Sequence, residues 1–434
     1  MTDYLAEFDK AAENQRFALV RSWIDRETLP FFKQLREQRP VLVTPECTLV
    51  ARHADVVDLL RQPTVFTTAL YLPKQANGKY LMSHDDDALH TREKGLMQGF
   101  LNRDDLPKVR AGVASICSEI LERANGKMEA AYGYCRAVPA GIVQNYFGLT
   151  GVSREKLIEW SYWAQYDTFH NQPFDARTDD ERKHIIAEHD RTAEEMSKYV
   201  IELVAHRLLM VKLGAPFHWL VRLATQLFGG KEALSDDIAG RLLRSGFPAE
   251  IGFDIERIGV NIAGLLIGAV ETTARAVAQV AQYLLSRPEW TRRAAETARL
   301  PDPARFDGIV WEALRFVSPF PYTFRECATD YVVGRGTSHA TPISPGTYVL
   351  CLTQSAMFDE AVFDAPDDFI PSRNFYGYFH FGFGSHECLG KYVGLVMIPE
   401  MLRNLFRCAE LKPTAPIDYK SGPFPEKYEL TWNP

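Results

Sequence analysis

The spacing of apolar residues changes along the chain and divides it into regions of different structure. Two short apolar runs at 40–44 and 48–52 predict a pair of strands, followed by a helix over 54–61. From about residue 90 to 300 apolar residues recur at spacings of three and four, which predicts helices. Beyond residue 319 short apolar runs predict strands, and a helix is expected again over 390–406.

Two long segments in the helical region differ in their surroundings. Segment 179–211 mixes many charges with periodic apolar residues and predicts an amphipathic helix that faces solvent. Segment 253–286 is largely apolar and lacks proline, which predicts a helix buried along most of its length. Its nearly uncharged part, 258–270, is shorter than the ~20 residues that cross a bilayer, so we expect no membrane anchor. No linker is visible, and we expect residues 1–434 to form a single domain.

Composition and charge narrow the class of protein. The chain is 46% hydrophobic and 24% charged, which is ordinary for a soluble globular protein. Its net charge of -7 argues against nucleic-acid binding. Residues 1–20 carry scattered charges and lack the apolar core of a signal peptide, so a cytoplasmic protein is expected. The seven cysteines are odd in number and form no CxxC pair, which disfavours a disulfide framework or a zinc site.

One cysteine lies in a glycine-rich stretch, residues 381–390, with the sequence FGFGSHECLG. Glycines at 382, 384 and 390 permit backbone conformations that other residues resist, and they let a bulky group approach closely. Cys388 precedes an expected helix, whose first N–H groups favour a thiolate over a thiol. Such a thiolate suits a cysteine-ligated haem. The alternative is a glycine-rich loop around an ordinary buried cysteine.

The stretch resembles the cytochrome P-450 signature in its bacterial form, with a histidine two residues before the cysteine. The matching residues are Phe381, Gly382, Gly384, His386, Cys388 and Gly390. The resemblance implies that Cys388 ligates the iron of haem b. It also implies a mainly α fold with a small β region, the triangular helical prism around a buried haem that is typical of the superfamily.

Three further residues match the family's structural network. Glu312 and Arg315 are three apart on an expected helix and can therefore pair, although an exposed pair would contribute little. They precede the cysteine loop by some seventy residues, as the Glu-x-x-Arg helix does in the family. Arg373 lies in a Phe-x-Pro-x-Arg segment, which matches the family's third member. The resemblance implies that these residues brace the cysteine loop.

The long apolar helix contains an acid and an alcohol side by side, Glu271 and Thr272. A buried threonine can satisfy its hydroxyl on the carbonyl four residues earlier, which offers a purely structural explanation. The resemblance instead implies that the pair delivers protons to bound dioxygen, and that Gly268 and Ala269 leave room for the oxygen. Ala269 departs from the family's usual second glycine.

The resemblance also places haem contacts. It implies that His90, Lys94, Arg325 and His386 contact the haem propionates, and that Phe381 and Gly382 lie against the ring. Lys94 stands where the family has arginine; it keeps the charge but loses the planar fork. As a weaker expectation, Ile267, Gly268, Tyr322 and Thr323 line the substrate pocket.

The resemblance implies a monooxygenase that inserts one atom of dioxygen into an apolar substrate. The chain has no G-x-G-x-x-G after a strand, so electrons are expected from a separate ferredoxin and its reductase. Basic residues after the cysteine loop and after the third helix of the family fold are expected to form a docking patch for an acidic ferredoxin. They are Lys391, Arg403, Arg407, Arg103, Lys108 and Arg110. Two alternatives remain open: an enzyme of the same fold that uses peroxide or hydroperoxide on a lipid-like substrate, and a haem sensor or carrier without turnover.

Overall fold

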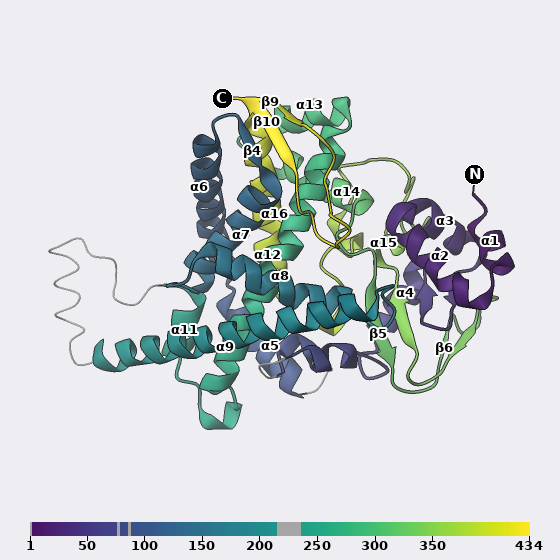
Figure 1. Cartoon of the computed structure of the whole chain (residues 1–434), viewed down its shortest axis with the longest axis horizontal. Helices are drawn as coiled ribbons and strands as arrows, with labels where there is room; N and C mark the ends of the chain where they lie inside the picture. The colour runs from purple at the N-terminus through teal and green to yellow at the C-terminus, as the bar shows by residue number, and fades with distance from the viewer. Residues whose placement is uncertain (1, 76–78, 86–87, 215–235) are drawn as a thin grey trace.

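Helices surround one long central helix in the computed structural model, which describes residues 2–75, 79–85, 88–214 and 236–434 (Figure 1). The α-helices are α1 (Tyr4–Lys10), α2 (Glu13–Arg26), α3 (Thr28–Gln38), α4 (His53–Leu60), α5 (Ala88–Phe100), α6 (Leu106–Ala124), α7 (Ala137–Ile142), α8 (Arg154–His170), α9 (Asp179–Gly214), α11 (Ile238–Arg244), α12 (Ile255–Leu285), α13 (Pro288–Thr297), α14 (Ala304–Phe316), α15 (Thr353–Ala356) and α16 (Lys391–Arg407). Shorter 3-10 and π segments are η1 (Ala69–Lys74), η2 (Leu81–Ser83), η3 (Arg103–Asp105), η4 (Ala131–Arg136), η5 (Val143–Phe147), η7 (Ala249–Ile251), η8 (Phe375–Gly377) and η9 (Gly384–His386).

The strands form three small sheets among the described residues. They are β1 (Val41–Val43), β2 (Thr48–Val50), β3 (Phe66–Thr67), β4 (Lys127–Glu129), β5 (Thr323–Cys327), β6 (Tyr331–Val333), β7 (Thr341–Ile343), β8 (Tyr348–Cys351), β9 (Ala409–Pro413) and β10 (Glu429–Asn433). The largest sheet has the order β1-β2-β8-β5-β3, in which only β2 and β8 are parallel. Strand β5 follows α14 in the chain and pairs antiparallel with β8. In this pairing Arg325 of β5 lies opposite Val349 of β8.

Helix α12 forms the centre of the molecule. It begins at the N-cap Asp254, whose side chain accepts a hydrogen bond from the Arg257 amide, and it continues for 31 residues without proline. It packs against α8, η4, α7, α14 and α16, and most of its residues are buried. By length and apolar composition α12 could cross a membrane, but in this fold it is the core helix around which the others pack.

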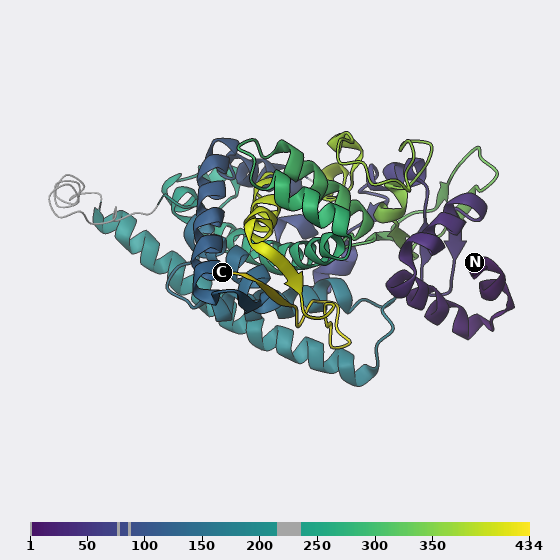
Figure 2. The ribbon, with the colours of Figure 1, turned by 90° about the horizontal axis from the view of Figure 1, so that it is seen from above.

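The N-terminal helices α1, α2 and α3 lie at one end of the molecule beside the large sheet (Figures 1 and 2). Aromatic rings hold them together: Tyr4 meets Trp23 and Phe31 edge-on at centroid distances of 5.4 and 5.7 Å. The periodicity of apolar residues did not predict these helices. Aromatic packing between short helices depends on residues far apart in the chain, and hydrophobic spacing within one segment does not reveal it.

The predicted fold class is confirmed, and the long elements lie where their patterns place them. The buried helix expected over 253–286 is α12, the amphipathic helix expected over 179–211 is α9, and the helix expected over 390–406 is α16. The two strands expected near residue 40 are β1 and β2, with Leu42 opposite Leu49.

Candidate functional site

The loop that carries Cys388 turns sharply before α16. Gly382 and Gly384 both adopt positive φ, at 73° and 76°, a region that other residues rarely enter. A Cβ atom on Gly384 would also lie 2.5 Å from the Leu60 carbonyl oxygen, so glycine is required there for space as well. The Cys388 amide donates to the Phe381 carbonyl at 2.8 Å and closes the loop.

Cys388 lies on the wall of an internal space. Of the seven cysteines, all of which are among the described residues, it alone has an exposed side chain. Surrounding protein nevertheless raises the pKa of its thiol by desolvation, while the Gly390 N–H and the Lys94 charge act in the opposite direction. A thiol that is accessible although protein surrounds it faces a cavity rather than bulk solvent. A bound metal ion would deprotonate such a thiol outright.

A buried charge network connects α14 to the segment before this loop. The Glu312 carboxylate accepts hydrogen bonds from Arg315 at 2.6 and 3.1 Å and from Arg373 at 3.1 Å. The Ile370 amide and the Tyr378 hydroxyl donate to it as well, at 2.9 and 2.6 Å. Glu312 and Arg315 are completely buried. The structure therefore brings together the three residues that the sequence grouped.

The network around Glu312 also holds the backbone of a neighbouring segment in place. Arg315 donates to the carbonyls of Met357, Pro366 and Asp368, which belong to the irregular segment leading into the cysteine loop. Burial alone would raise the pKa of Glu312, but the hydrogen bonds it accepts hold the pKa below its usual value. Glu312 is therefore ionised at neutral pH.

Helix α12 presents an accessible stripe in its otherwise buried middle part. Gly268 is exposed and Thr272 is half-buried, whereas Val270, Glu271 and Thr273 are buried. A Cβ atom on Gly268 would meet no heavy atom within 4 Å, so open space lies beside this turn. The Thr272 hydroxyl donates to the Gly268 carbonyl at 2.7 Å, which is the structural arrangement considered for this threonine.

Glu271 does not contact Thr272, because neighbouring residues on a helix point about 100° apart. Its carboxylate accepts two hydrogen bonds, at 2.8 and 2.9 Å, from Nε of Arg136, which lies at the end of η4. Both side chains are buried, and Arg136 also reaches the half-buried Glu426 at 3.4 Å. Burial raises the pKa of Glu271, and the Arg136 charge opposes that rise. Arg136 is 135 residues away along the chain, and no local pattern near Glu271 points to it.

The residues expected at the haem propionates lie close together. The rings of His90 and His386 are 4.6 Å apart, and Lys94 donates to the Ser385 and Glu387 carbonyls of the cysteine loop. Burial, then Arg325, His90 and Lys94, lower the pKa of His386 to about 2, so the ring is neutral. Neither His386 nitrogen makes a hydrogen bond of normal geometry with the described residues.

Arg325 adds an interior charge to this group. It is buried, its Nη1 donates to the Phe324 carbonyl at 2.7 Å, and no carboxylate of the described residues pairs with it. A buried guanidinium beside an unpartnered imidazole is suited to an anionic group such as a propionate. Together with the accessible Cys388 thiol and the open turn at Gly268, these residues fit a thiolate-ligated haem.

The residues expected to line the substrate pocket differ in their burial and hydrogen bonding. Ile267 and Thr323 are half-buried, and Ile267 offers its carbonyl to Gln165 and Ser161 of α8. The Tyr322 hydroxyl accepts a hydrogen bond from Arg21 at 2.7 Å, so its polar end is occupied by the N-terminal helices.

Sequence reasoning also missed Tyr80 as a residue of this cavity. Its ring occupies the space above Gly264, where a Cβ atom would lie 2.0 Å away. Burial first, and then the nearby Cys388, raise the pKa of its phenol. Tyr80 therefore lies between α12 and the cysteine loop. An isolated tyrosine in a loop carries no spacing signal that could have marked it.

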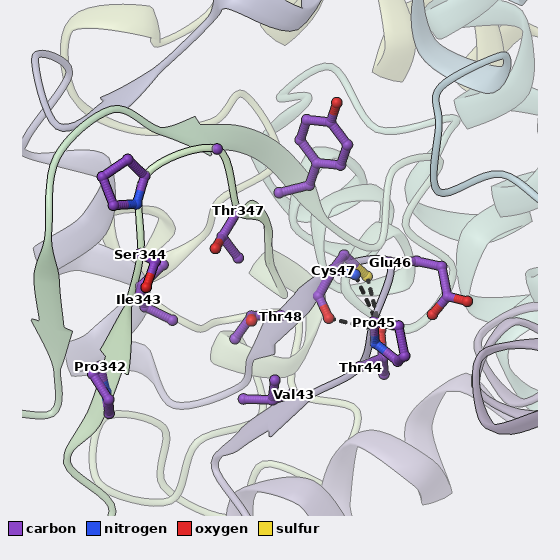
Figure 3. A pocket seen from close by; sticks show the side chains of 13 residues that line it. Val43, Thr44, Pro45, Glu46, Cys47, Thr48, Pro342, Ile343, Ser344 and Thr347 are labelled. Carbon is purple, nitrogen blue, oxygen red and sulfur yellow. Dashed lines mark hydrogen bonds between the residues drawn. The ribbon is translucent and has the colours of Figure 1, made fainter. Parts of the chain in front are cut away.

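A surface pocket of about 420 Å3 lies apart from these residues, where the β1–β2 turn meets the turn between β7 and β8 (Figure 3). One side is a tight turn in which Thr44 and Cys47 hydrogen-bond to each other, and the other consists largely of Pro342 to Tyr348. None of the expected site residues lines this pocket. We assign it no part in the chemistry.

The expected basic docking patch is wrong in its composition. Lys391 pairs with Glu387, Lys108 with Asp236, and Arg110 with Glu400 and Asp307. Arg403 is buried and donates to the Ala298 and Leu300 carbonyls, so it offers no surface charge. Arg103 and Arg407 stay exposed. The sequence shows the positive residues, but the carboxylates that neutralise them come from distant segments.

Comparison with known proteins decides the family. Residues 237–421 match the family model described as cytochrome P-450. This segment contains α12, the Glu312 network and the cysteine loop. The chain belongs to the cytochrome P-450 family.

Relatives and structures agree with this membership. The chain is 25% identical over 380 residues to a steroid C26-monooxygenase of Mycolicibacterium smegmatis, covering 85% of this chain and 84% of the relative. It is 22% identical over 413 residues to one of Mycobacterium tuberculosis, covering 92% and 93%. The structure of cytochrome P-450 CYP109Q5 from Chondromyces apiculatus superposes with a TM-score of 0.72 at 18% identity, covering 94% and 96%. The protein is a cytochrome P-450 monooxygenase.

Proposed function

We propose that this cytochrome P-450 uses Cys388 as its iron ligand and inserts one atom of dioxygen into an apolar substrate held beside α12. The observation that carries this proposal is the accessible thiol of Cys388 in an interior space that also contains the open turn at Gly268. Gly390 would support the ligand, because its N–H acts on the sulfur and favours the thiolate.

The haem would be held at two places. Cys388 would ligate the iron, while Arg325 and His386, with His90 and Lys94 beside them, would receive the propionates. Phe381 and Gly382 would lie against the ring from the cysteine side. When bound, the haem supplies the dioxygen-activating redox chemistry, for which two electrons and two protons are needed per turnover.

The protons would pass through Thr272 and Glu271. The Thr272 hydroxyl can accept and donate at once, and it lies on the accessible stripe of α12. Glu271 is held by Arg136, so it would deliver protons only when this ion pair loosens. Arg136 already contacts a second carboxylate, the half-buried Glu426, and this contact gives the guanidinium an alternative partner nearer to solvent.

Electrons would come from a separate ferredoxin and its reductase, because the chain carries no nucleotide-binding glycine motif of its own. We infer that residues 1–434 work as one domain in the cytoplasm. The relatives named steroid C26-monooxygenases suggest a lipid-like, largely apolar substrate, such as a steroid. Use of peroxide in place of dioxygen and electrons is the alternative that the experiment must distinguish.

The test supplies NADH, ferredoxin and reductase with isotopically labelled dioxygen to the haem-loaded protein, using steroids and long-chain lipids that shift its Soret band. We expect a product containing one labelled oxygen atom and little turnover with peroxide alone. Turnover with peroxide but none with the electron-transfer proteins would support the peroxide-using alternative. A protein that binds haem and these lipids without oxidising them by either route would contradict an enzymatic role.

A further inference from the structure

The accessible stripe of α12 continues beyond Thr272 to a charged residue. Four residues at spacings of four, three and four share one face of the helix: Gly268, Thr272, Arg275 and Gln279. Gly268 is exposed and the other three are half-buried, whereas residues 276–278 are buried. Arg275 therefore opens onto the same side of α12 as the turn at Gly268, about 10 Å further along the axis.

The surroundings of Arg275 contain aromatic rings and one imidazole. Its Nη1 donates to Nε2 of His170, at the end of α8, across a long 3.5 Å. Its guanidinium lies 5.7 Å from the ring centre of Phe320, in the segment before β5. Its Nε is buried without a hydrogen-bond partner. Among the described residues no carboxylate lies within ion-pair distance of Arg275.

The charged and titratable groups around Arg275 do not compensate it. Tyr419, Tyr322, Asp25 and Arg21 act on it from a distance. Asp25 has a side chain that is 61% exposed and pairs with Arg21 at 3.6 Å, so it is already shared. Burial and the neighbouring arginines lower the pKa of His170 well below its usual value, which leaves that ring neutral. An arginine does not lose its proton in a protein, so this positive charge lacks a counter-ion.

We propose that Arg275 binds an acidic group of the substrate, so that the apolar body of a lipid-like carboxylic acid extends along α12 toward Thr272 and Cys388. This inference rests on the proposed function, since it specifies the substrate class of the same cavity. A guanidinium forms paired hydrogen bonds with a carboxylate, and the uncompensated charge would then be satisfied only when the substrate is bound.

A second feature is the apolar wall beside Arg275. Gln279, one turn beyond Arg275, already donates through Nε2 to the Tyr419 hydroxyl at 3.2 Å. The rings of Phe320 and Phe424 contact His170 at 5.9 and 5.2 Å and make the rest of this wall apolar. A carboxyl group on an apolar molecule would pair with the Arg275 charge, and its apolar part would pack against these rings.

The test compares acids with their neutral partners on the haem-loaded protein. Dodecanoic, hexadecanoic and lithocholic acids are titrated against the matching alcohols or methyl esters, with affinity measured by calorimetry and by the Soret shift. We expect at least one acid to bind about ten- to hundredfold more tightly than its neutral partner. Arg275→Gln should abolish this preference, and Arg275→Lys should keep part of it. If no acid is preferred over its neutral partner, the proposal is overturned.

Controls separate this proposal from a structural role and from the proposed function. Arg293→Gln removes an exposed arginine of α13 and should leave the preference intact. Arg275→Gln should not lower the melting temperature, since it removes a buried charge without a counter-ion; a large fall with an unchanged acid preference would show a purely structural arginine. Neutral lipids that are bound and oxidised as well as acids would contradict the role of Arg275 while leaving the monooxygenase proposal intact.

Discussion

At the scale of single residues, Thr272 and its neighbours on α12 meet different surroundings. Thr272 lies on the accessible stripe, Thr273 is buried, and Glu271 is held by Arg136 on another side. We expect Thr272→Ala to consume NADH at a normal rate but to release much of the oxygen as peroxide, because the hydroxyl that moves protons is gone. Thr273→Ala is the matched control and should stay coupled. The measurement is the ratio of product and peroxide to NADH consumed; full coupling in Thr272→Ala would remove this threonine from proton delivery.

The Glu312 carboxylate gives the protein a defined sensitivity to acid. Its pKa is lowered in the folded state, so its contribution to stability is present at neutral pH and is lost as the pH falls below about 4.5. We expect the melting temperature of the native protein to drop in this range. Glu312→Gln should be less stable at pH 7 and should show a smaller drop. A Glu312→Gln profile parallel to that of the native protein would assign the acid sensitivity to other groups.

At the scale of elements, the network between α14 and the segment before the cysteine loop determines whether haem is retained. Arg315→Ala leaves Glu312 buried with fewer partners and frees three backbone carbonyls. The expected cost is ~3–5 kcal/mol of folding free energy, with loss of haem incorporation. The haem-to-protein absorbance ratio and the melting temperature measure it, with exposed Arg293→Ala as the control. Normal haem content in Arg315→Ala would show that the loop does not depend on the network.

The turn of α12 at Gly268 offers a test of the cavity itself. Gly268→Ala places a methyl group where no heavy atom lies within 4 Å, so the helix should become more stable by about 0.5–1 kcal/mol. The same methyl narrows the space beside Thr272, so bulky lipids should bind more weakly. Gly99→Ala, at an exposed position of α5 that is equally open, should change stability without changing lipid affinity. Unchanged lipid affinity in Gly268→Ala would place the substrate elsewhere.

Elements that depend only on the residue pattern within one segment could be predicted from the sequence. The apolar run of α12 and the loop around Cys388 are both visible from local spacing. Contacts between distant residues were not predictable: nothing near Glu271 points to Arg136, and the carboxylates that neutralise Lys108 and Arg110 come from residues 236, 307 and 400. No role was assigned to Arg275 from the sequence, and only the structure shows that it has no partner carboxylate among the described residues.

At the scale of the whole molecule, neutralisation of the expected basic patch bears on how the redox partner docks. Of its six residues only Arg103 and Arg407 are exposed without a carboxylate in ion-pair distance among the described residues. We therefore expect the rate of electron transfer from an acidic ferredoxin to vary only weakly with ionic strength. Stopped-flow reduction at low and high salt measures this. A rate that falls steeply with added salt would show that several uncompensated charges guide docking.

The assignment of Cys388 as the iron ligand draws on the residue, its loop and the family. One absorption spectrum tests it directly. The reduced, haem-loaded protein is mixed with carbon monoxide, and the Soret band is recorded for the native chain, Cys388→Ser and Cys408→Ser. We expect the native chain and Cys408→Ser to show the long-wavelength band of a thiolate-ligated haem, and Cys388→Ser to lack it. If Cys388→Ser kept that band, or if the native chain bound haem without showing it, Cys388 would not be the iron ligand.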